Sequence, residues 1–333
     1  MATKMIPPAG ARAFIDAAGW QSAEILPLAG DASFRRYFRI VDGARRAILM
    51  DAPPPHEDPG PFLSVGQWLC DNGFAAPEIL ARDLTQGLVL LEDFGDERLR
   101  EHVDAVPQDE APLYERGVDL LVDLHKFPAQ NGLAPYDRAV YQREAGLLTE
   151  WFCPAAGLNV DAAAYSAAWD AVLPIAELDD APVVTVLRDY HAENIMLLPD
   201  LGRSHGLGLL DFQDALAGHP AYDLVSFLQD ARRDVSPAVE AAMLAHYQAH
   251  ARCSADFEAA YAVLGAQRNA KIIGIFTRLC QRDGKPRYLD FLPRMWGLLE
   301  RDLAHPALAP VTRWFDENVP AEARGELRID DAA

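Results

Sequence analysis

The sequence predicts an α+β fold in which a small β-rich lobe is followed by a larger, mostly helical lobe. Short apolar runs separated by turn residues dominate the first third of the chain, whereas long amphipathic stretches dominate it after about residue 95. The later strand-like runs cluster around one polar stretch, VLRDYHAENIMLL at 186–198. We therefore expect two domains, an N-lobe over residues 1–94 and a C-lobe over residues 95–333.

The N-lobe is expected to hold a small antiparallel sheet. Asp42-Gly43 lies between two apolar runs and is typical of a tight hairpin turn, because glycine tolerates positive φ. A helix is expected over 62–70, after a proline-rich loop. The expected strands are the apolar runs at 23–28, 34–40, 46–52, 78–84 and 88–93.

In the C-lobe, amphipathic periodicity predicts long helices at 112–126, 237–250 and 255–281. Ser236 and Ser254 precede the last two and are expected to begin them, because a serine side chain can accept a helix N-terminal N–H group. The runs at 183–187 and 194–198 resemble the two strands of a buried hairpin, so the polar residues between them need an explanation.

Bulk properties exclude several classes of function. A net charge of −20 over 333 residues disfavours binding of nucleic acid or anionic lipid. The sequence contains no apolar run of about 18 residues and no signal-peptide core, so a cytoplasmic protein without a membrane span is expected. Four widely spaced cysteines fit reduced thiols. An anionic ligand would need a local basic cluster, and FRRYFR at 34–39 is one.

Three polar residues of the central segment carry the chemical interpretation. Asp189 and Asn194 are five positions apart, and Asp211 follows 17 positions after Asn194, next to an apolar run. Phosphoryl transfer from ATP needs a carboxylate that accepts the proton of the attacking hydroxyl, and oxygen ligands for Mg²⁺. We interpret Asp189 as the base, and Asn194 and Asp211 as metal ligands, each placed where a strand ends. A solvated polar loop is the alternative.

The segments RDYHAEN and LLDFQ resemble the catalytic loop and the metal-binding strand of the aminoglycoside phosphotransferase family, whose members have the bilobal protein-kinase-like fold. The resemblance implies ATP and Mg²⁺ as cofactors. It also implies that LVLLEDFGD is the hinge between lobes, where the backbone near Glu92 and Phe94 contacts adenine. Ile48 would lie above the ring and Met196 below it, although both residues could equally be core. The turn that ends at Ser33 is expected to contact the nucleotide.

Two departures from the family pattern occur together. The strand that usually carries a phosphate-binding Lys ends here in Met50, and the following helix, PFLSVGQWLC, has no acidic residue to pair with such a Lys. We expect Arg35 or Arg36 to supply the missing cation. Strand alternation puts these two arginines on opposite faces, and exposed strand positions are the alternative for both. Leu187 replaces the family's usual His.

Further residues receive candidate roles from their positions. His191 is either a γ-phosphate contact or a packed histidine, and Asp223 is expected to brace the catalytic loop from a helix start. Arg188, Asp214 and Arg233 are candidate substrate contacts. Arg232, Arg278 and Arg282 are further candidates for a substrate carboxylate, with surface ion pairs as the alternative.

A narrower resemblance suggests the substrate. GDASFRRYFRI, ILMDAPP, RDYHAENIM, LLDFQDALAGHPAYDLVSFLQDARRDV and RNAKIIGIFTRLCQRDGKPRYL are similar to bacterial anomeric sugar kinases of cell-wall recycling. Those enzymes phosphorylate N-acetylmuramate and N-acetylglucosamine at O1, so the resemblance implies a small amino sugar as the acceptor and a sugar 1-phosphate as the product. Protein partners are unknown.

Three alternatives stay open at this point. One is a kinase of the same fold acting on an aminoglycoside or choline, and another is a non-catalytic nucleotide-binding module. The third is a metallohydrolase using Asp189, His191, Asp211 and His219, which no metal-ligand spacing supports. P-loop and Rossmann folds are excluded because their glycine motifs do not occur in the sequence.

Overall fold

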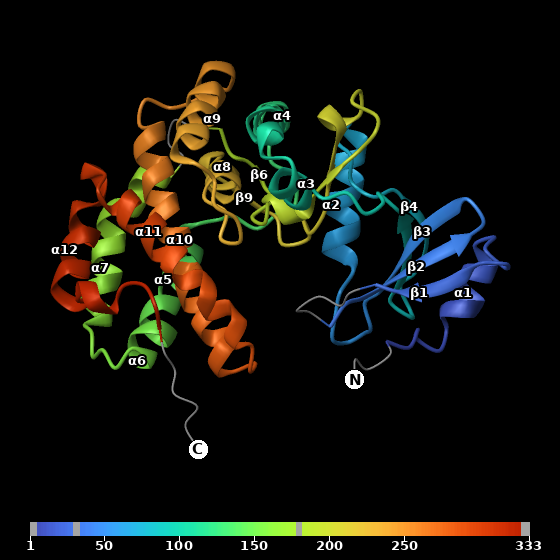
Figure 1. Cartoon of the computed structure of the whole chain (residues 1–333), viewed down its shortest axis with the longest axis horizontal. Coiled ribbons are helices and arrows are strands. Elements are labelled where there is room, and N and C mark those ends of the chain that lie inside the picture. Colours follow the sequence, from blue (N-terminus) through green and yellow to red (C-terminus); the bar gives the residue numbers. More distant parts are fainter. Residues whose placement is uncertain (1–4, 29–33, 178–181, 328–333) are drawn as a thin grey trace. The chain divides into compact units, whose positions relative to one another are not determined.

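A computed structural model describes residues 5–28, 34–177 and 182–327 (Figure 1). Contacts within the chain define two compact units. Unit 1 comprises Met1–Pro107 and Glu193–Asp214, and unit 2 comprises Gln108–Ala192 and Ala215–Ala333. These units are groups of residues with many mutual contacts and are not the two lobes of the sequence analysis. The predicted lobe boundary after residue 94 therefore stays a prediction.

Unit 1 contains an antiparallel sheet with the strand order β1-β2-β3-β5-β4, and a separate two-stranded ladder of β7 and β8. The sheet contains all the strands predicted for the N-lobe. The elements of unit 1 are β1 (Glu24–Pro27), β2 (Arg36–Asp42), β3 (Arg45–Asp51), β4 (Ile79–Asp83), β5 (Leu88–Glu92), β7 (Ile195–Leu197), β8 (Leu207–Leu209), α1 (Ala11–Ala17), α2 (Gly60–Asp71) and α3 (Leu99–Ala105).

The predicted hairpin between β2 and β3 is confirmed. Asp42 pairs with Arg45, so only Gly43 and Ala44 form the turn, and Gly43 has a φ of 60°. Positive φ carries little steric cost for glycine, which is why this position marks the reversal of the chain.

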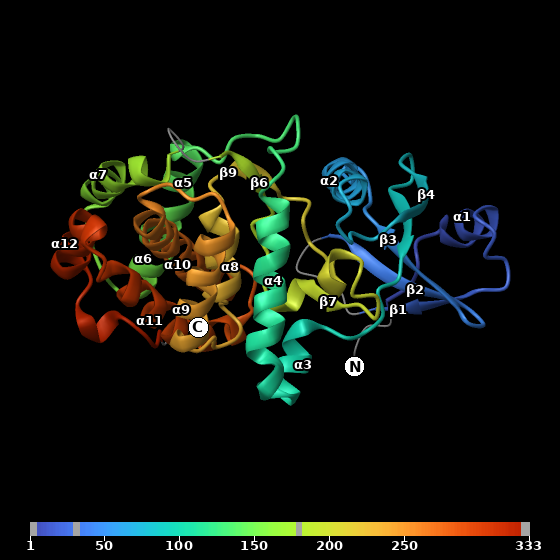
Figure 2. The ribbon, with the colours of Figure 1, turned by 90° about the horizontal axis from the view of Figure 1, so that it is seen from above.

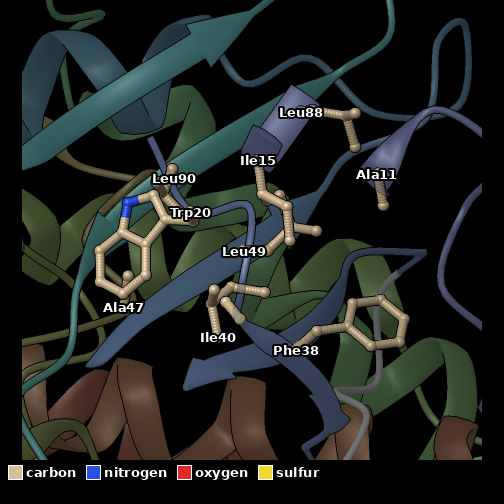
Figure 3. Close-up of a cluster of buried hydrophobic side chains, with 10 residues drawn as sticks. Ala11, Ile15, Trp20, Phe38, Ile40, Ala47, Leu49, Leu88 and Leu90 are labelled. Carbon is tan, nitrogen blue, oxygen red and sulfur yellow. The ribbon is translucent and has the colours of Figure 1, made fainter. Parts of the chain in front are cut away.

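One face of the sheet is covered by α1, and the two pack together in a cluster of buried hydrophobic side chains (Figure 3). Alternate residues of neighbouring strands point to this face, as strand geometry requires. They pack against Ile15 of α1 and Trp20, both of which are buried. The sheet residues of this cluster are Phe38, Ile40, Ala47, Leu49, Leu88 and Leu90.

Unit 2 is mostly helical, and its strands β6 and β9 form a short antiparallel ladder. The helix α10 packs against α5, α8 and α11 (Figure 2). The elements of unit 2 are α4 (Glu110–Leu124), α5 (Arg138–Ala145), a π-helical turn (Leu148–Phe152), α6 (Cys153–Ala155), α7 (Ala162–Val172), β6 (Val184–Val186), β9 (Leu216–Gly218), α8 (Ala221–Leu228), α9 (Pro237–His250), α10 (Phe257–Gln281), α11 (Leu292–Leu303) and α12 (Ala309–Asn318). Across the described residues, we find no helix with the length and apolar character needed to cross a bilayer.

One predicted helix start is confirmed and one is wrong. Ser236 caps α9, where its hydroxyl accepts the backbone N–H of Val239 at 3.2 Å. Ser254 does not begin α10, because the helix starts at Phe257 after Asp256. A turn over the intervening residues separates Ser254 from the first helical N–H groups.

The expected hairpin across the central polar stretch is also wrong. β6 pairs with β9, and β7 pairs with β8. The two apolar runs therefore do not pair with each other, and each pairs with a strand that lies later in the sequence. Each of these strands is only three residues long, and a short apolar run does not identify its own partner.

Candidate active site

The loop that follows β6 is fixed from the start of α8. The buried carboxylate of Asp223 accepts the backbone N–H groups of Leu187 and Arg188 at 2.6 and 2.8 Å. Ser226, one turn along the same helix, donates its hydroxyl to the carbonyl of Arg188 at 3.0 Å. The residue that follows, Asp189, is the predicted base. The expected brace by Asp223 is thereby confirmed.

Residues after α8 hold the other end of this loop. Asp230, which is 1% exposed, accepts the N–H of Ala192 at 3.3 Å and that of Arg232 at 2.8 Å. The hydroxyl of Tyr190 donates to the carbonyl of Gly117 in α4 at 2.7 Å. The backbone on either side of Asp189 is therefore anchored to α4, α8 and the segment after α8. A group that must receive a proton benefits from such fixed geometry.

The buried ring of His191 lies against Arg232, with a distance of 3.0 Å between its Nε2 and a guanidinium nitrogen. An arginine can only donate hydrogen bonds, so Nε2 is the acceptor and carries no proton. The buried ring with this contact fits the alternative of a packed histidine. Contact of His191 with a phosphate stays a prediction.

The candidate substrate arginines of unit 2 are both paired with carboxylates. Arg188 contacts Glu144, and Arg233 donates to Glu110 at 2.5 Å and to the hydroxyl of Tyr114 at 3.3 Å. Asp214 belongs to unit 1 and is exposed. Roles of these residues in binding a substrate stay predictions.

In unit 1, the ladder of β7 and β8 brings the two candidate metal ligands together. Asn194 directly precedes β7 and Asp211 follows β8, so the expectation that Asn194 lies at a strand end is wrong: it lies at a strand start. The Nδ2 atom of Asn194 is 3.4 Å from Oδ2 of Asp211, and Gln213 donates to Oδ1 of Asp211 at 2.8 Å. Asp211 has a φ of 60°, a strained conformation for a residue with a side chain.

The helix α2 stabilises this strained turn. Phe212 stacks on Phe62 of α2 with 5.0 Å between the ring centroids, and Gly66 lies against the same ring. A side chain at Gly66 would meet Phe212 at 3.2 Å, so the glycine allows the close approach. In the absence of a Lys–Glu pair, this aromatic contact connects α2 to the segment of the candidate metal ligand Asp211.

The predicted hinge residues lie close to one another in unit 1. Glu92 accepts two hydrogen bonds from Arg203 at 2.7 and 3.0 Å, and the guanidinium of Arg203 lies 5.6 Å from the centroid of the Phe94 ring. Phe94 packs against Gly208, which pairs with Met196 across the β7–β8 ladder. Ile48 on β3 is opposite Leu91, the residue before Glu92. Ser33 lies outside the described residues.

The arginines of the basic cluster have different partners. Arg36 donates to the buried Asp51 at 2.8 Å and to the carbonyl of Ile6 at 3.1 Å, and its guanidinium lies 5.9 Å from the centroid of the core ring of Phe38. Arg35 lies 3.6 Å from Glu57 in the proline-rich loop. Arg36 is therefore on the α1 face of the sheet, whereas Arg35 is not part of that packing.

The three residues of the predicted catalytic set divide between the units. Asp189 belongs to unit 2, and Asn194 and Asp211 belong to unit 1. The structure thus groups the two candidate metal ligands, and a cleft shared with Asp189 stays a prediction. The donor set of Asn194 and Asp211 fits Mg²⁺, because carboxylate and amide oxygens are hard ligands.

Comparison with known proteins identifies the family. Residues 24–260 match the phosphotransferase enzyme family, APH. The chain belongs to this family. It is 39% identical to the N-acetylmuramate/N-acetylglucosamine kinase of Caulobacter vibrioides, with 94% of this chain and 96% of that protein covered. It is 38% identical to the kinase of the same name from Pseudomonas aeruginosa, with 88% and 89% covered.

Solved structures support the fold of this phosphotransferase. The choline kinase LicA from Streptococcus pneumoniae superposes with a TM-score of 0.58 at 14% identity, covering 86% of this chain and 93% of that chain. The streptomycin–ATP complex of APH(2")-IIa also gives 0.58 at 14% identity, covering 91% and 98%. The predicted protein-kinase-like α+β fold is confirmed, as is an enzyme that transfers a phosphoryl group to an alcohol.

Several residues around the loops of this phosphotransferase were not predicted. Asp230 lies in the segment LLDFQDALAGHPAYDLVSFLQDARRDV, which already resembles the sugar kinases. Its acidic side chain, close in sequence to Arg232 and Arg233, could have indicated a role in holding the loop. Glu144 contacts Arg188, and Lys271 contacts Glu144. Both Glu144 and Lys271 lie on helices, where charged residues usually mark a solvated face. Their roles depend on packing of α5 against α10, which no local pattern reveals.

Proposed function

We propose that this phosphotransferase is an ATP-dependent kinase that phosphorylates the anomeric hydroxyl of N-acetylmuramate and N-acetylglucosamine, giving the sugar 1-phosphate. The observation that carries the proposal is the relative of Caulobacter vibrioides, which is named for both sugars and is 39% identical over 94% of this chain. ATP as the donor is supported by a fold neighbour in which ATP is bound.

In the proposed reaction the sugar O1 attacks the γ-phosphorus of ATP. The bond between this phosphorus and the β–γ bridging oxygen breaks, and ADP leaves with the electron pair of that bond. The hydroxyl proton passes to Asp189, whose loop is anchored by Asp223 and Asp230. An anomeric hydroxyl is more acidic than an ordinary alcohol, so a carboxylate is basic enough for this transfer.

The nucleotide half of the proposal uses residues of unit 1. Asn194 and Asp211 would hold Mg²⁺, and the turn at Asp211 is already fixed by the stacking of Phe212 on Phe62 of α2. When bound, the ion neutralises charge on the phosphate oxygens. Adenine would contact the backbone near Glu92 and Phe94, with Ile48 and Met196 on its two faces. Ser33 would be a further contact of the nucleotide.

Arg35 is the best candidate for the cation that replaces the missing Lys. Arg36 is already engaged by Asp51, which is 2% exposed, and by the carbonyl of Ile6. Removing Arg36 from Asp51 to bind a phosphate would leave a buried carboxylate without its counter-charge, which is costly. Arg35 pairs at a longer distance with Glu57.

The test is ³¹P NMR of the product formed from ATP, Mg²⁺ and N-acetylglucosamine, with Asp189→Asn as the control. We expect an anomeric phosphate signal for the wild type and at least about 10²-fold slower turnover for the variant, since a general base typically contributes that factor. A 6-phosphate product, or an unchanged rate in Asp189→Asn, would overturn the mechanism.

A coupled assay for ADP release addresses the other acceptors. It compares both amino sugars with choline and an aminoglycoside under the same conditions. A preference for choline or the aminoglycoside would favour another kinase of this fold. Nucleotide binding without turnover on any acceptor would favour a non-catalytic module, and phosphate release without ATP would favour a hydrolase.

A further inference from the structure

Glu144 of α5 is a buried carboxylate that receives three donors. It is 7% exposed, and it contacts the guanidinium of Arg188, the hydroxyl of Tyr136 at 2.5 Å and the ammonium of Lys271 at 3.0 Å. The guanidinium of Arg188 also lies 5.5 Å from the centroid of the Tyr136 ring. Both carboxylate oxygens therefore have partners, as a buried charge requires.

These donors come from separate parts of unit 2. Tyr136 precedes α5, Arg188 lies in the loop before Asp189, and Lys271 lies in the middle of α10. The contact of Gln267 of α10 with the carbonyl of Tyr141 at 3.1 Å, together with that of Lys271 with Glu144, places the two helices alongside each other over several residues. Glu144 thus ties the loop to the helical core of unit 2.

The charges of this cluster depend on Glu144. Burial alone would raise the pKa of the Glu144 carboxyl, but Lys271 and Arg188 outweigh burial, so its pKa lies below the ordinary value. The carboxylate is therefore ionised at neutral pH. A neutral side chain at this position would leave the two cations facing each other without the anion that separates them.

The backbone of Arg188 needs this anchor. Its φ is 69°, in the left-handed region that is strained for a residue with a side chain. Asp223 holds its N–H, Ser226 holds its carbonyl, and Glu144 holds its guanidinium. Strain persists only where the surroundings determine the conformation. Arg188 shares a peptide bond with Asp189, so a fixed conformation of Arg188 fixes the backbone position from which the Asp189 side chain projects.

We propose that Glu144 is a positioning residue for Asp189, acting through Arg188. The inference rests on the proposed function, in which Asp189 is the base. Glu144 touches neither sugar nor nucleotide in this role; it keeps the strained turn from relaxing, and so keeps the base aligned with the acceptor hydroxyl. Lys271 closes the cluster and balances the charge of Glu144.

The experiment compares Glu144→Gln with the double variant Glu144→Gln/Lys271→Met. The amide has the shape of the carboxylate but not its charge, so we expect kcat to fall about 10- to 100-fold, as misplacement of a catalytic group by about 1 Å does, with KM for ATP within about twofold. Glu144→Gln leaves the cations Arg188 and Lys271 without the carboxylate that both of them contact, and the double variant removes the charge of Lys271. Thermal stability should therefore recover in the double variant, whereas kcat should remain low.

Glu177→Gln is the matched control, because Glu177 forms an ion pair with Arg138 of the same helix α5 at 2.6 Å but at an exposed position. It should leave kcat unchanged. The inference is overturned if Glu144→Gln keeps the wild-type kcat, or if kcat recovers together with stability in the double variant, since a purely structural role predicts that recovery. Absence of turnover in the wild-type enzyme would contradict the proposed function itself.

Discussion

The carboxylate of Asp223 lies 2.6 Å from the backbone nitrogen of Leu187, and this contact fixes the loop of the proposed base. Asp223 is completely buried and lies in the first turn of α8, where the helix dipole favours a negative charge. Burial nevertheless raises its pKa to about 7, against the two backbone N–H groups that lower it. The two oxygens of this buried acid each accept a backbone N–H group, which offsets part of the cost of burying it.

Asp223→Asn should therefore destabilise the protein and slow turnover. The amide can accept one of the two N–H groups, but its NH₂ group faces the other, so one buried donor loses its acceptor. We expect the free energy of unfolding in urea to fall by about 1–3 kcal/mol, the typical cost of a buried unpaired polar group. The control is Asp283→Asn, at an exposed ion pair with Arg282, which should change little. Equal stability of the two variants would contradict the brace.

Local signals account for what the sequence predicts correctly. Asp223 was predicted because it lies at a fixed place in a family motif, and the β2–β3 turn because Asp42-Gly43 between two apolar runs places a residue that tolerates positive φ at the reversal of the chain. The partners of β6 and β7 were not predictable, since a run of three mostly apolar residues fits either neighbour. Glu144 was missed because a carboxylate on an amphipathic helix usually faces water, and only the packing of α10 buries it.

Two buried histidines should make the protein less stable in acid. Burial, together with the nearby His219, lowers the pKa of His125 to about 3, and burial lowers that of His219 to about 4. The Nδ1 atom of His219 accepts the N–H of Ala221 at 3.1 Å, which requires the neutral ring. Below about pH 6.5 the unfolded chain binds protons that the folded chain does not, so the free energy of unfolding falls as pH falls.

Between pH 7 and pH 5 each histidine should remove about 2 kcal/mol from the free energy of unfolding. Asp223 acts with the opposite sign: its pKa is raised on folding, so its contribution is present below about pH 4 and is lost as pH rises towards 7. The measurement is therefore urea unfolding at both pH values for the wild type and for His219→Asn. The variant should show a shallower loss, and an identical loss would contradict the assignment.

Arg35→Ala and Arg36→Ala should have separable effects. Arg36→Ala removes the partner of buried Asp51, so the free energy of unfolding should fall by about 1–3 kcal/mol. Arg35→Ala should instead weaken the binding of ATP about tenfold, because one charge-assisted phosphate contact typically contributes that much. Calorimetric titration with ATP and thermal unfolding distinguish the two outcomes. Near-wild-type ATP affinity in both variants would contradict a role of Arg35 or Arg36 in binding the nucleotide.

Gly208→Ala should disturb the proposed hinge. A methyl group at this position would meet the Phe94 ring at 2.7 Å, closer than van der Waals contact permits, so the ring and its backbone must move. We expect KM for ATP to rise several-fold and the free energy of unfolding to fall by about 1–3 kcal/mol. Gly297→Ala is the control: it lies within α11, where a methyl group meets nothing within 4 Å, and alanine there should stabilise by up to about 1 kcal/mol. If Gly208→Ala lowers stability but leaves KM unchanged, Phe94 packs against Gly208 without contributing to nucleotide binding.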